Sequence, residues 1–286
     1  MSPRTAHQPP ARRSGSPAVL ALLGVLLSFG LLSAACSSDD DASPSATTST
    51  TEAANKVTGD ITVSAAASLK ETFTQIGKDF ESANPGSKVT INFGSSGDLA
   101  TQIQSGAPVD VAAFAAESNM TTLADASLLD GSSEIFATNS LVIVTKPGNP
   151  KKITTLEDLA AVAEAGGTIS LCADTAPCGK YANQVLQAAG VTIPADKVTR
   201  GQDVRATLSA VTDGDADAAI VYVTDAEAAG DTVDSVEIPI DANAVAKYPI
   251  AVVKATTNAE ASKAFMEYVL GPDAQKVLAA AGFGAP

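Results

Sequence analysis

From Asp60 onward, short apolar segments alternate with segments whose apolar residues recur at helical spacing, and this alternation restricts the folds open to the chain. Residues 61–63 predict a strand. The segment that follows predicts a helix with an apolar face made of Leu69, Phe73, Ile76 and Phe80. Strands that alternate with helices form mostly parallel sheets covered by helices, so the sequence predicts an α/β fold.

The same reading continues to the end of the chain. Further strands are predicted at 89–93, 109–114, 141–145, 168–171 and 218–223, and a helix at 180–189 is followed by Gly190 as its C-terminal cap. A polar turn precedes the strand near residue 140, and the chain returns near Lys247-Tyr248-Pro249. We therefore expect two lobes, one of residues 59–139 plus 248–286 and one of residues 140–247.

The first 35 residues have the pattern of a signal peptide. Arg4, Arg12 and Arg13 precede an apolar stretch of about 15 residues, which is shorter than the ~20 needed to span a membrane. Small residues then lead into Cys36, as at a bacterial lipoprotein cleavage site, although Ser33 stands where an aliphatic residue is usual. The alternative is an ordinary signal peptide with an incidental cysteine.

Residues 37–55 contain no aliphatic side chain larger than that of alanine. Such a segment cannot bury enough apolar surface to offset the entropy lost on ordering. We expect residues 36–58 to be a lipidated cysteine and a solvated tether. The predicted location is therefore extracytoplasmic, with the folded body anchored to the cell membrane through Cys36 alone.

Charge and histidine content exclude several classes of function. The formal net charge of −14 becomes more negative when the three leader arginines are removed, so nucleic acid is not an expected partner. An anion would have to be held by local dipoles. The one histidine, His7, lies in the predicted leader, so the mature chain lacks Ser-His-Asp triads, Cys-His pairs and histidine metal ligands. We expect no enzymatic activity.

Four loops that open predicted helices hold the candidate chemistry, because helix N-termini offer unpaired N–H groups and a partial positive charge. They span residues 65–71, 93–99, 172–181 and 201–205. In the first loop, Ser68 and Glu71 form an S-x-x-E capping box, and taken alone this pattern favours a cap. The second loop, GSSGD at 94–98, is equally consistent with a flexible turn.

The third loop contains two cysteines, Cys172 and Cys178, six positions apart across a turn. In an exported protein this spacing favours a disulfide. The alternative, a reactive pair, lacks the C-x-x-C spacing and any histidine that would lower a thiol pKa. Tyr222 ends a strand where the next loop begins. This position by itself is typical of a tyrosine whose ring packs in the core and whose hydroxyl contacts water.

Taken together, these segments resemble the periplasmic molybdate-binding proteins of ABC transporters. The resemblance rests on AAASL (65–69), FGSSGDLATQI (93–103), APCGKYA (176–182), QDVRATL (202–208) and IVYVTDA (220–226), with PVDVAAFA (108–115), NSLVIV (139–144) and the C-terminal tail. It covers about residues 59–284. It implies a type II periplasmic-binding-protein fold, with two lobes, a hinge and a ligand cleft between the lobes.

The resemblance also implies a ligand, its contacts and a partner. The ligand would be molybdate or tungstate, delivered by a monomer to a transmembrane permease, with no cofactor and no protein–metal bond. The implied contacts are Ser68, Ser96, Cys178, Val204 and Tyr222, of which Cys178 and Val204 donate backbone N–H groups. Cys178 stands where alanine is common, and Gly97 and Asp98 stand where relatives often have Ser and Thr.

A fully ionised oxyanion needs only donors, which helix N-termini can supply without a buried counter-charge. We therefore expect Asp98 and Asp203 to cap helices and face away; an inward carboxylate would favour phosphate, which carries a proton. The alternatives are a receptor for sulfate, thiosulfate or phosphate, and an iron-binding relative, which would need clustered tyrosines and carboxylates. A lyase or hydrolase would need a base beside Ser68 or Ser96.

Overall fold

The computed structural model describes residues 56–286, so the predicted signal peptide and Cys36 lie outside the described residues. The strands are β1 (Gly59–Ala66), β2 (Ser87–Gly94), β3 (Val111–Ala113), β4 (Glu134–Thr145), β5 (Ile169–Cys172), β6 (Val198–Gly201), β7 (Ala218–Tyr222), β8 (Asp234–Glu237) and β9 (Val245–Val252). The α-helices are α1 (Lys70–Ala83), α2 (Ser96–Gln104), α3 (Glu117–Asp125), α4 (Leu156–Glu164), α5 (Pro177–Ala188), α6 (Val204–Thr212), α7 (Val223–Ala229), α8 (Ala259–Leu270) and α9 (Pro272–Ala280). Short 3-10 helices occupy Ala67–Leu69 (η1), Ala195–Lys197 (η2) and Gly230–Thr232 (η3).

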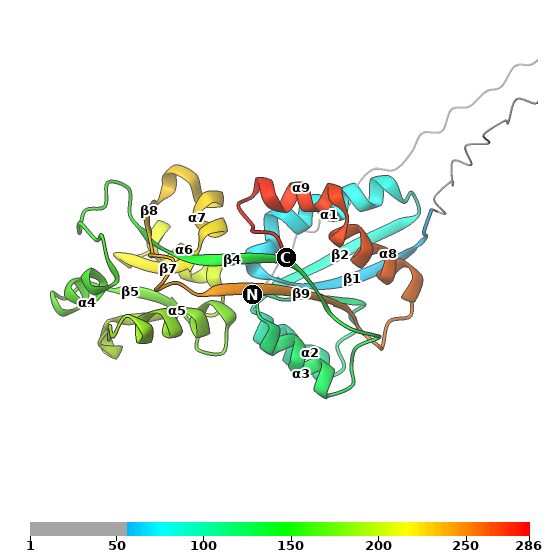
Figure 1. The fold of residues 1–286 in the computed structure, drawn as a ribbon, viewed down its shortest axis with the longest axis horizontal. Helices are drawn as coiled ribbons and strands as arrows, with labels where there is room; N and C mark the ends of the chain where they lie inside the picture. Colours follow the sequence, from blue (N-terminus) through cyan, green and yellow to red (C-terminus); the bar gives the residue numbers. More distant parts are fainter. Residues whose placement is uncertain (1–55) are drawn as a thin grey trace, which may run out of the picture. The chain divides into compact units, whose positions relative to one another are not determined.

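The strands follow the order β2-β1-β3-β9-β4-β7-β5-β6, and β8 pairs with β4 outside this path. Below, lobe 1 means residues 59–139 plus 248–286, and lobe 2 means residues 140–247. Strands β4 and β9 run between the lobes (Figure 1). Strand β4 pairs with β9 as far as Ser140 and with β7 from Leu141 onward. The two lobes are therefore joined by two antiparallel crossing strands.

The period-2 alternation of strands explains why both faces of the lobe 1 sheet are buried. In and just after β3, Val111 and Ala113 face the main core, whereas Ala112 and Phe114 face a second cluster with Leu99 and Met120. Helices α1, α8 and α9 cover the first face, and α2 and α3 cover the second (Figure 1). The face of α1 predicted from its spacing is fully buried.

Lobe 2 has the same layered construction. Strand β5 pairs in parallel with both β6 and β7, and helices α7 and α5 lie on opposite sides of this sheet (Figure 1).

The predicted helix at 180–189 begins earlier, at Pro177, because proline at the first helical position has the fixed φ that a helix needs. Gly190 follows the helix with φ 68°, as expected for a C-terminal cap.

The two-lobed α/β fold is confirmed. Parallel pairing holds inside each lobe, between β1 and β2, β1 and β3, β5 and β6, and β5 and β7. The pairs made by β4 and β9 are antiparallel, so parallel pairing is less dominant than expected. Strand β4 is also longer than the predicted 141–145, because its first half belongs to lobe 1.

The end of the predicted tether contacts the folded body. Val57 N–H donates to Asn84 Oδ1 at 3.2 Å, and its carbonyl accepts from Ser87 Oγ at 2.9 Å.

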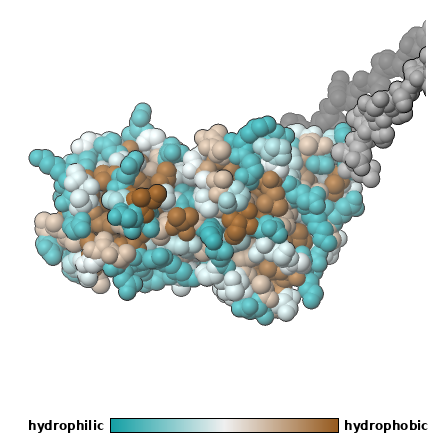
Figure 2. Space-filling view, viewed as in Figure 1, coloured by the Kyte–Doolittle hydropathy of each residue, from teal (hydrophilic) through white to brown (hydrophobic). Residues whose placement is uncertain are grey.

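Figure 2 shows apolar areas scattered over both lobes on one face, among polar ones. Among residues 56–286, none of the helices has both the length and the apolar character required to span a membrane.

Candidate functional site

The strand ends of both lobes converge on one place. Strands β1 and β2 run in register to their last pair, Ala66 and Gly94, and β5 and β6 run in register to Cys172 and Gly201. Each of these strands leads into a helix. Because ligands of open α/β sheets bind outside the carboxyl ends of the strands, this position is the expected place for a site.

A small cavity lies there, between the lobes. It is lined by Ala66, Ala67, Ser68, Gly94, Ser95, Ser96 and Ala115 from lobe 1, and by Ala176, Pro177, Cys178, Asp203, Val204 and Tyr222 from lobe 2. All five residues predicted to contact the ligand are therefore brought together. Only about 10 Å³ of it is open to the centre of a water molecule, far below the ~300–1,000 Å³ typical of pockets for organic ligands, so the cavity suits a small ion.

The lobe 1 side presents two serine hydroxyls. Ser96 is the first residue of α2, and its Oγ accepts from Ala115 N–H at 3.0 Å. Ser68 lies inside η1, and its Oγ is 3.0 Å from the Tyr248 hydroxyl. The capping box predicted for Ser68 and Glu71 is wrong, because the η1 turn precedes α1 and makes Leu69 the N-cap. Glu71 instead pairs with Arg205.

The lobe 2 side presents the first turns of α5 and α6. Pro177 occupies the first position of α5 and has no N–H, so the first amide of that helix belongs to Cys178. A disulfide joins Cys178 to Cys172, the last residue of β5, with the two Cα atoms 5.8 Å apart. It ties the start of α5 to the end of the strand before it.

Val204 begins α6, and its N-cap is Asp203. The Asp203 carboxylate accepts from Ala206 N–H at 2.9 Å, so it caps the helix as expected even though the residue borders the cavity. Asp98 differs from expectation: it lies exposed in the first turn of α2, whose N-cap is Ser95, and makes no capping bond. Asp98 does not border the cavity, so Asp203 is the one carboxylate among the cavity-lining residues described.

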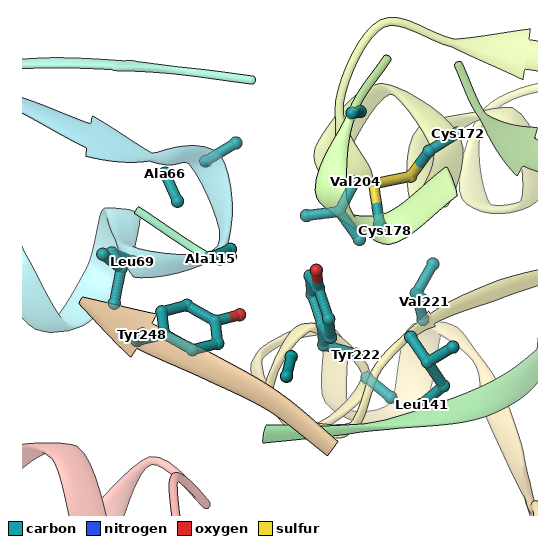
Figure 3. Packing of buried hydrophobic residues seen from close by; sticks show 14 of the residues in the cluster. Ala66, Leu69, Ala115, Leu141, Cys172, Cys178, Val204, Val221, Tyr222 and Tyr248 are labelled. Atoms are coloured by element: carbon teal, nitrogen blue, oxygen red, sulfur yellow. A yellow bond between two sulfur atoms is a disulfide. The ribbon is translucent and has the colours of Figure 1, made fainter. Parts of the chain in front are cut away.

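Tyr222 closes the site. It is 1% exposed, and its hydroxyl has no hydrogen-bond partner among the described residues. Figure 3 shows this hydroxyl pointing into the space between Ala66 and Ala115 on one side and Cys178 and Val204 on the other. Burial raises the pKa of Tyr222 well above its usual value, and the neighbouring Tyr248 adds to the shift. The side chain is therefore a neutral O–H donor at physiological pH.

Within residues 56–286, no lysine or arginine lines the cavity. Arg205, which follows Val204, forms an ion pair at 2.8 Å with Glu71, from α6 to α1. The positive potential of the cavity therefore comes from helix N-termini and hydroxyl dipoles.

Sequence reasoning missed three polar residues at or behind the cavity. The Ser95 hydroxyl is buried and unpartnered among the described residues. Tyr248 and Asn139, on the crossing strands, form a buried polar group behind Ser68. The second hydroxyl in GSSG was a visible signal for Ser95, whereas Tyr248 and Asn139 carry no local pattern because only the fold places them beside Ser68.

A buried carboxyl, Asp225 in α7, lies in the same region and was also missed. Its Oδ2 has no partner among the described residues. Burial raises its pKa to about 7, an effect opposed by Arg205 and increased by Glu71. Asp225 does not border the cavity, so it is not a ligand contact.

The arrangement can bind a small anion by donation. Each serine hydroxyl that faces the cavity has no basic side chain bonded to it that could remove its proton, which is what a nucleophile would require. Neutral donors from both lobes around a small cavity, with two crossing strands between the lobes, define a binding protein that closes on its ligand.

The comparisons agree with this class. The chain belongs to the family of bacterial extracellular solute-binding proteins, whose profile matches residues 61–284. This family is not a family of enzymes. The molybdate-binding protein ModA of Mycobacterium tuberculosis is 38% identical over 265 residues, which is 93% of this chain and 97% of that protein.

Two solved structures extend the comparison. The periplasmic molybdate-binding protein of Azotobacter vinelandii has a TM-score of 0.68 and 25% identity, and the match covers 79% of this chain and 99% of that one. The sulfate-binding protein SubI of M. tuberculosis has a TM-score of 0.69 at 24% identity, covering 78% and 86%. The second likeness concerns the fold alone.

Proposed function

We propose that this protein captures molybdate, or tungstate, outside the cytoplasm and delivers it to the permease of an ABC transporter. The observation that carries the proposal is the lining of the interlobe cavity. Its polar groups are hydroxyls, helix N-termini and one carboxylate, that of Asp203, which caps α6. The Tyr222 hydroxyl has no protein partner among the described residues. A tetrahedral oxyanion without a proton needs donors of this kind and no acceptor.

The ligand contacts proposed are the hydroxyls of Ser68, Ser96 and Tyr222 and the backbone N–H groups of Cys178 and Val204. We add Ser95 to these contacts because its hydroxyl is buried and has no partner among the described residues. The molybdenum atom would be held only through its oxygens. The naming of the M. tuberculosis and A. vinelandii relatives as molybdate-binding proteins supports molybdate over sulfate or phosphate.

The proposed mechanism is capture by lobe closure. A ligand that contacts both lobes binds the closed form better than the open form and so shifts the population toward closure. The Arg205–Glu71 ion pair and the approach of Gly97 to the Thr175 carbonyl bring the lobes together at the rim. The closed form would then dock on the permease, with Cys36 as the lipid anchor and the protein acting as a monomer.

A thermal-shift comparison tests the proposal. A ligand that binds only the folded state raises the melting temperature as its concentration exceeds the dissociation constant. We expect molybdate and tungstate to raise it by several degrees at micromolar concentration, while sulfate and phosphate need far higher concentrations. A larger shift with sulfate or phosphate than with molybdate would contradict the assignment of the ligand. No shift with any of the four would contradict the anion site itself.

A further inference from the structure

Four buried polar side chains form a connected group behind the cavity. Tyr248 Oη lies 3.0 Å from Ser68 Oγ, and Asn139 Nδ2 lies 3.4 Å from Tyr248 Oη and 2.8 Å from Thr224 Oγ1. All four are less than 9% exposed, and Tyr248 is fully buried. Tyr248 and Asn139 belong to the crossing strands β9 and β4, and the cavity does not extend to either.

The backbone fixes the orientation of the Asn139 amide in this group. Ser140 N–H donates to Asn139 Oδ1 at 2.9 Å, which identifies that atom as the amide oxygen. The Asn139 NH₂ group therefore faces Thr224 and Tyr248 and donates to both. Because Tyr248 Oη accepts from Asn139, its own proton is free to go to Ser68 Oγ.

The hydrogen bond from Tyr248 affects how Ser68 can bind the ligand. A serine oxygen that accepts from Tyr248 keeps its own proton for another acceptor, and the cavity lies on the open side of Ser68. Ser96 is held in the same way, because its oxygen accepts from Ala115 N–H. Ser68 and Ser96 can thus each donate a proton into the cavity, and each keeps one lone pair.

Packing holds the Tyr248 ring in this position. Its centroid lies 6.1 Å from Phe136, 5.4 Å from Phe283 and 6.0 Å from Tyr222, all in edge contacts. Figure 3 shows its hydroxyl directed toward Tyr222. The removal of the hydroxyl alone would therefore leave the ring contacts in place.

We propose that Tyr248, oriented by Asn139, is a positioning residue that occupies one lone pair of Ser68, directs the serine proton into the cavity and so favours fully deprotonated oxyanions over protonated ones. This inference rests on the proposed function. A protonated anion such as hydrogen phosphate needs an acceptor in its site, and Ser68 offers one more lone pair when it is released from Tyr248. Tyr248 and Asn139 thereby act on the choice of ligand without touching it.

The test is a double-mutant cycle read by calorimetric titration of the purified protein with molybdate and, separately, with inorganic phosphate. We expect Tyr248→Phe to weaken molybdate binding by about tenfold or more, because the Ser68 hydroxyl loses the bond that orients it and becomes free to rotate. Phosphate binding should change less, so the ratio of the two affinities falls. In a Ser68→Ala background, Tyr248→Phe should have no further effect.

Tyr268→Phe is the matched control, because this tyrosine lies on α8 against Phe80 and remote from the cavity. Asn139→Ala provides a second variant that should shift the affinity ratio in the same direction if Tyr248→Phe does not fold. Equal losses for both anions, or additive losses in the cycle, would overturn the positioning role. If the unaltered protein does not bind molybdate, the proposed function fails instead.

Discussion

At the scale of single residues, substitution of the Tyr222 hydroxyl gives the most direct test. It is buried, neutral and without a partner in the described part of the chain, so the unbound protein loses little when it is removed. A hydrogen bond to a charged ligand contributes about 1.5–3 kcal/mol. Tyr222→Phe should therefore weaken molybdate binding about ten- to hundredfold in a titration while leaving the melting temperature of the ligand-free protein unchanged or slightly higher. Unchanged affinity would remove Tyr222 from the site.

Asp225 gives a prediction on stability and pH. Its pKa is raised from 3.8 to about 7 by burial, so the folded state keeps this proton when the unfolded state has lost it. Stability from this group is present at low pH and is lost as the pH rises from about 4 to about 7. The full effect is of the order of 4 kcal/mol.

Asp225→Asn mimics the protonated carboxyl and cannot ionise. We expect this variant to be more stable than the unaltered protein at pH 8, by about 2–4 kcal/mol in denaturant titrations, with the difference shrinking toward pH 5. A difference that does not vary with pH would show that Asp225 is ionised in the folded protein at both values.

At the scale of elements, the approach of α2 to the loop before α5 controls closure. A Cβ at Gly97 would lie 2.6 Å from the Thr175 carbonyl oxygen, which belongs to the opposite lobe. Gly97→Ala should therefore hold the lobes apart and weaken molybdate binding by about tenfold or more, with the fold of each lobe intact. Gly77→Ala is the control, since its Cβ would meet only ordinary contacts within lobe 1. Equal affinities for the two variants would contradict this account of closure.

The elements that repeat a local pattern could be predicted from sequence. The apolar face of α1, the capping role of Asp203 and the C-terminal cap at Gly190 each depend on neighbours within a few positions. The S-x-x-E pattern at Ser68 failed because a 3-10 turn shifts the start of α1 by one residue, a shift that tertiary contacts decide. Antiparallel pairing of β4 and β9 was missed because their partners are more than 100 positions apart.

The residues of the candidate site also divide into those that the sequence could predict and those that it could not. The five predicted contact residues share one cavity, and they were found through a family resemblance across four loops and a strand end. Tyr248 and Asn139 were not found, because nothing in their local sequence places them behind Ser68. Contacts of a glycine across the cleft, such as that of Gly97 with Thr175, likewise depend on the closed arrangement.

At the scale of the whole molecule, the account predicts a change of shape on binding. Two crossing strands, β4 and β9, connect the lobes, and the cavity takes its lining from both sides. Small-angle scattering should show a smaller radius of gyration when molybdate is added, and sulfate at the same concentration should leave it unchanged. A radius that does not change with molybdate would argue against capture by closure.

The central claim is that a cavity of neutral donors holds one fully deprotonated tetrahedral oxyanion. The most direct measurement is calorimetric titration of the protein at neutral pH with molybdate, tungstate, sulfate and phosphate in turn. The account predicts one site per chain, with molybdate and tungstate bound more tightly than sulfate and phosphate by orders of magnitude. Phosphate as the tightest ligand would contradict it, because that result would require an acceptor for the phosphate proton, such as an inward-facing Asp203 carboxylate.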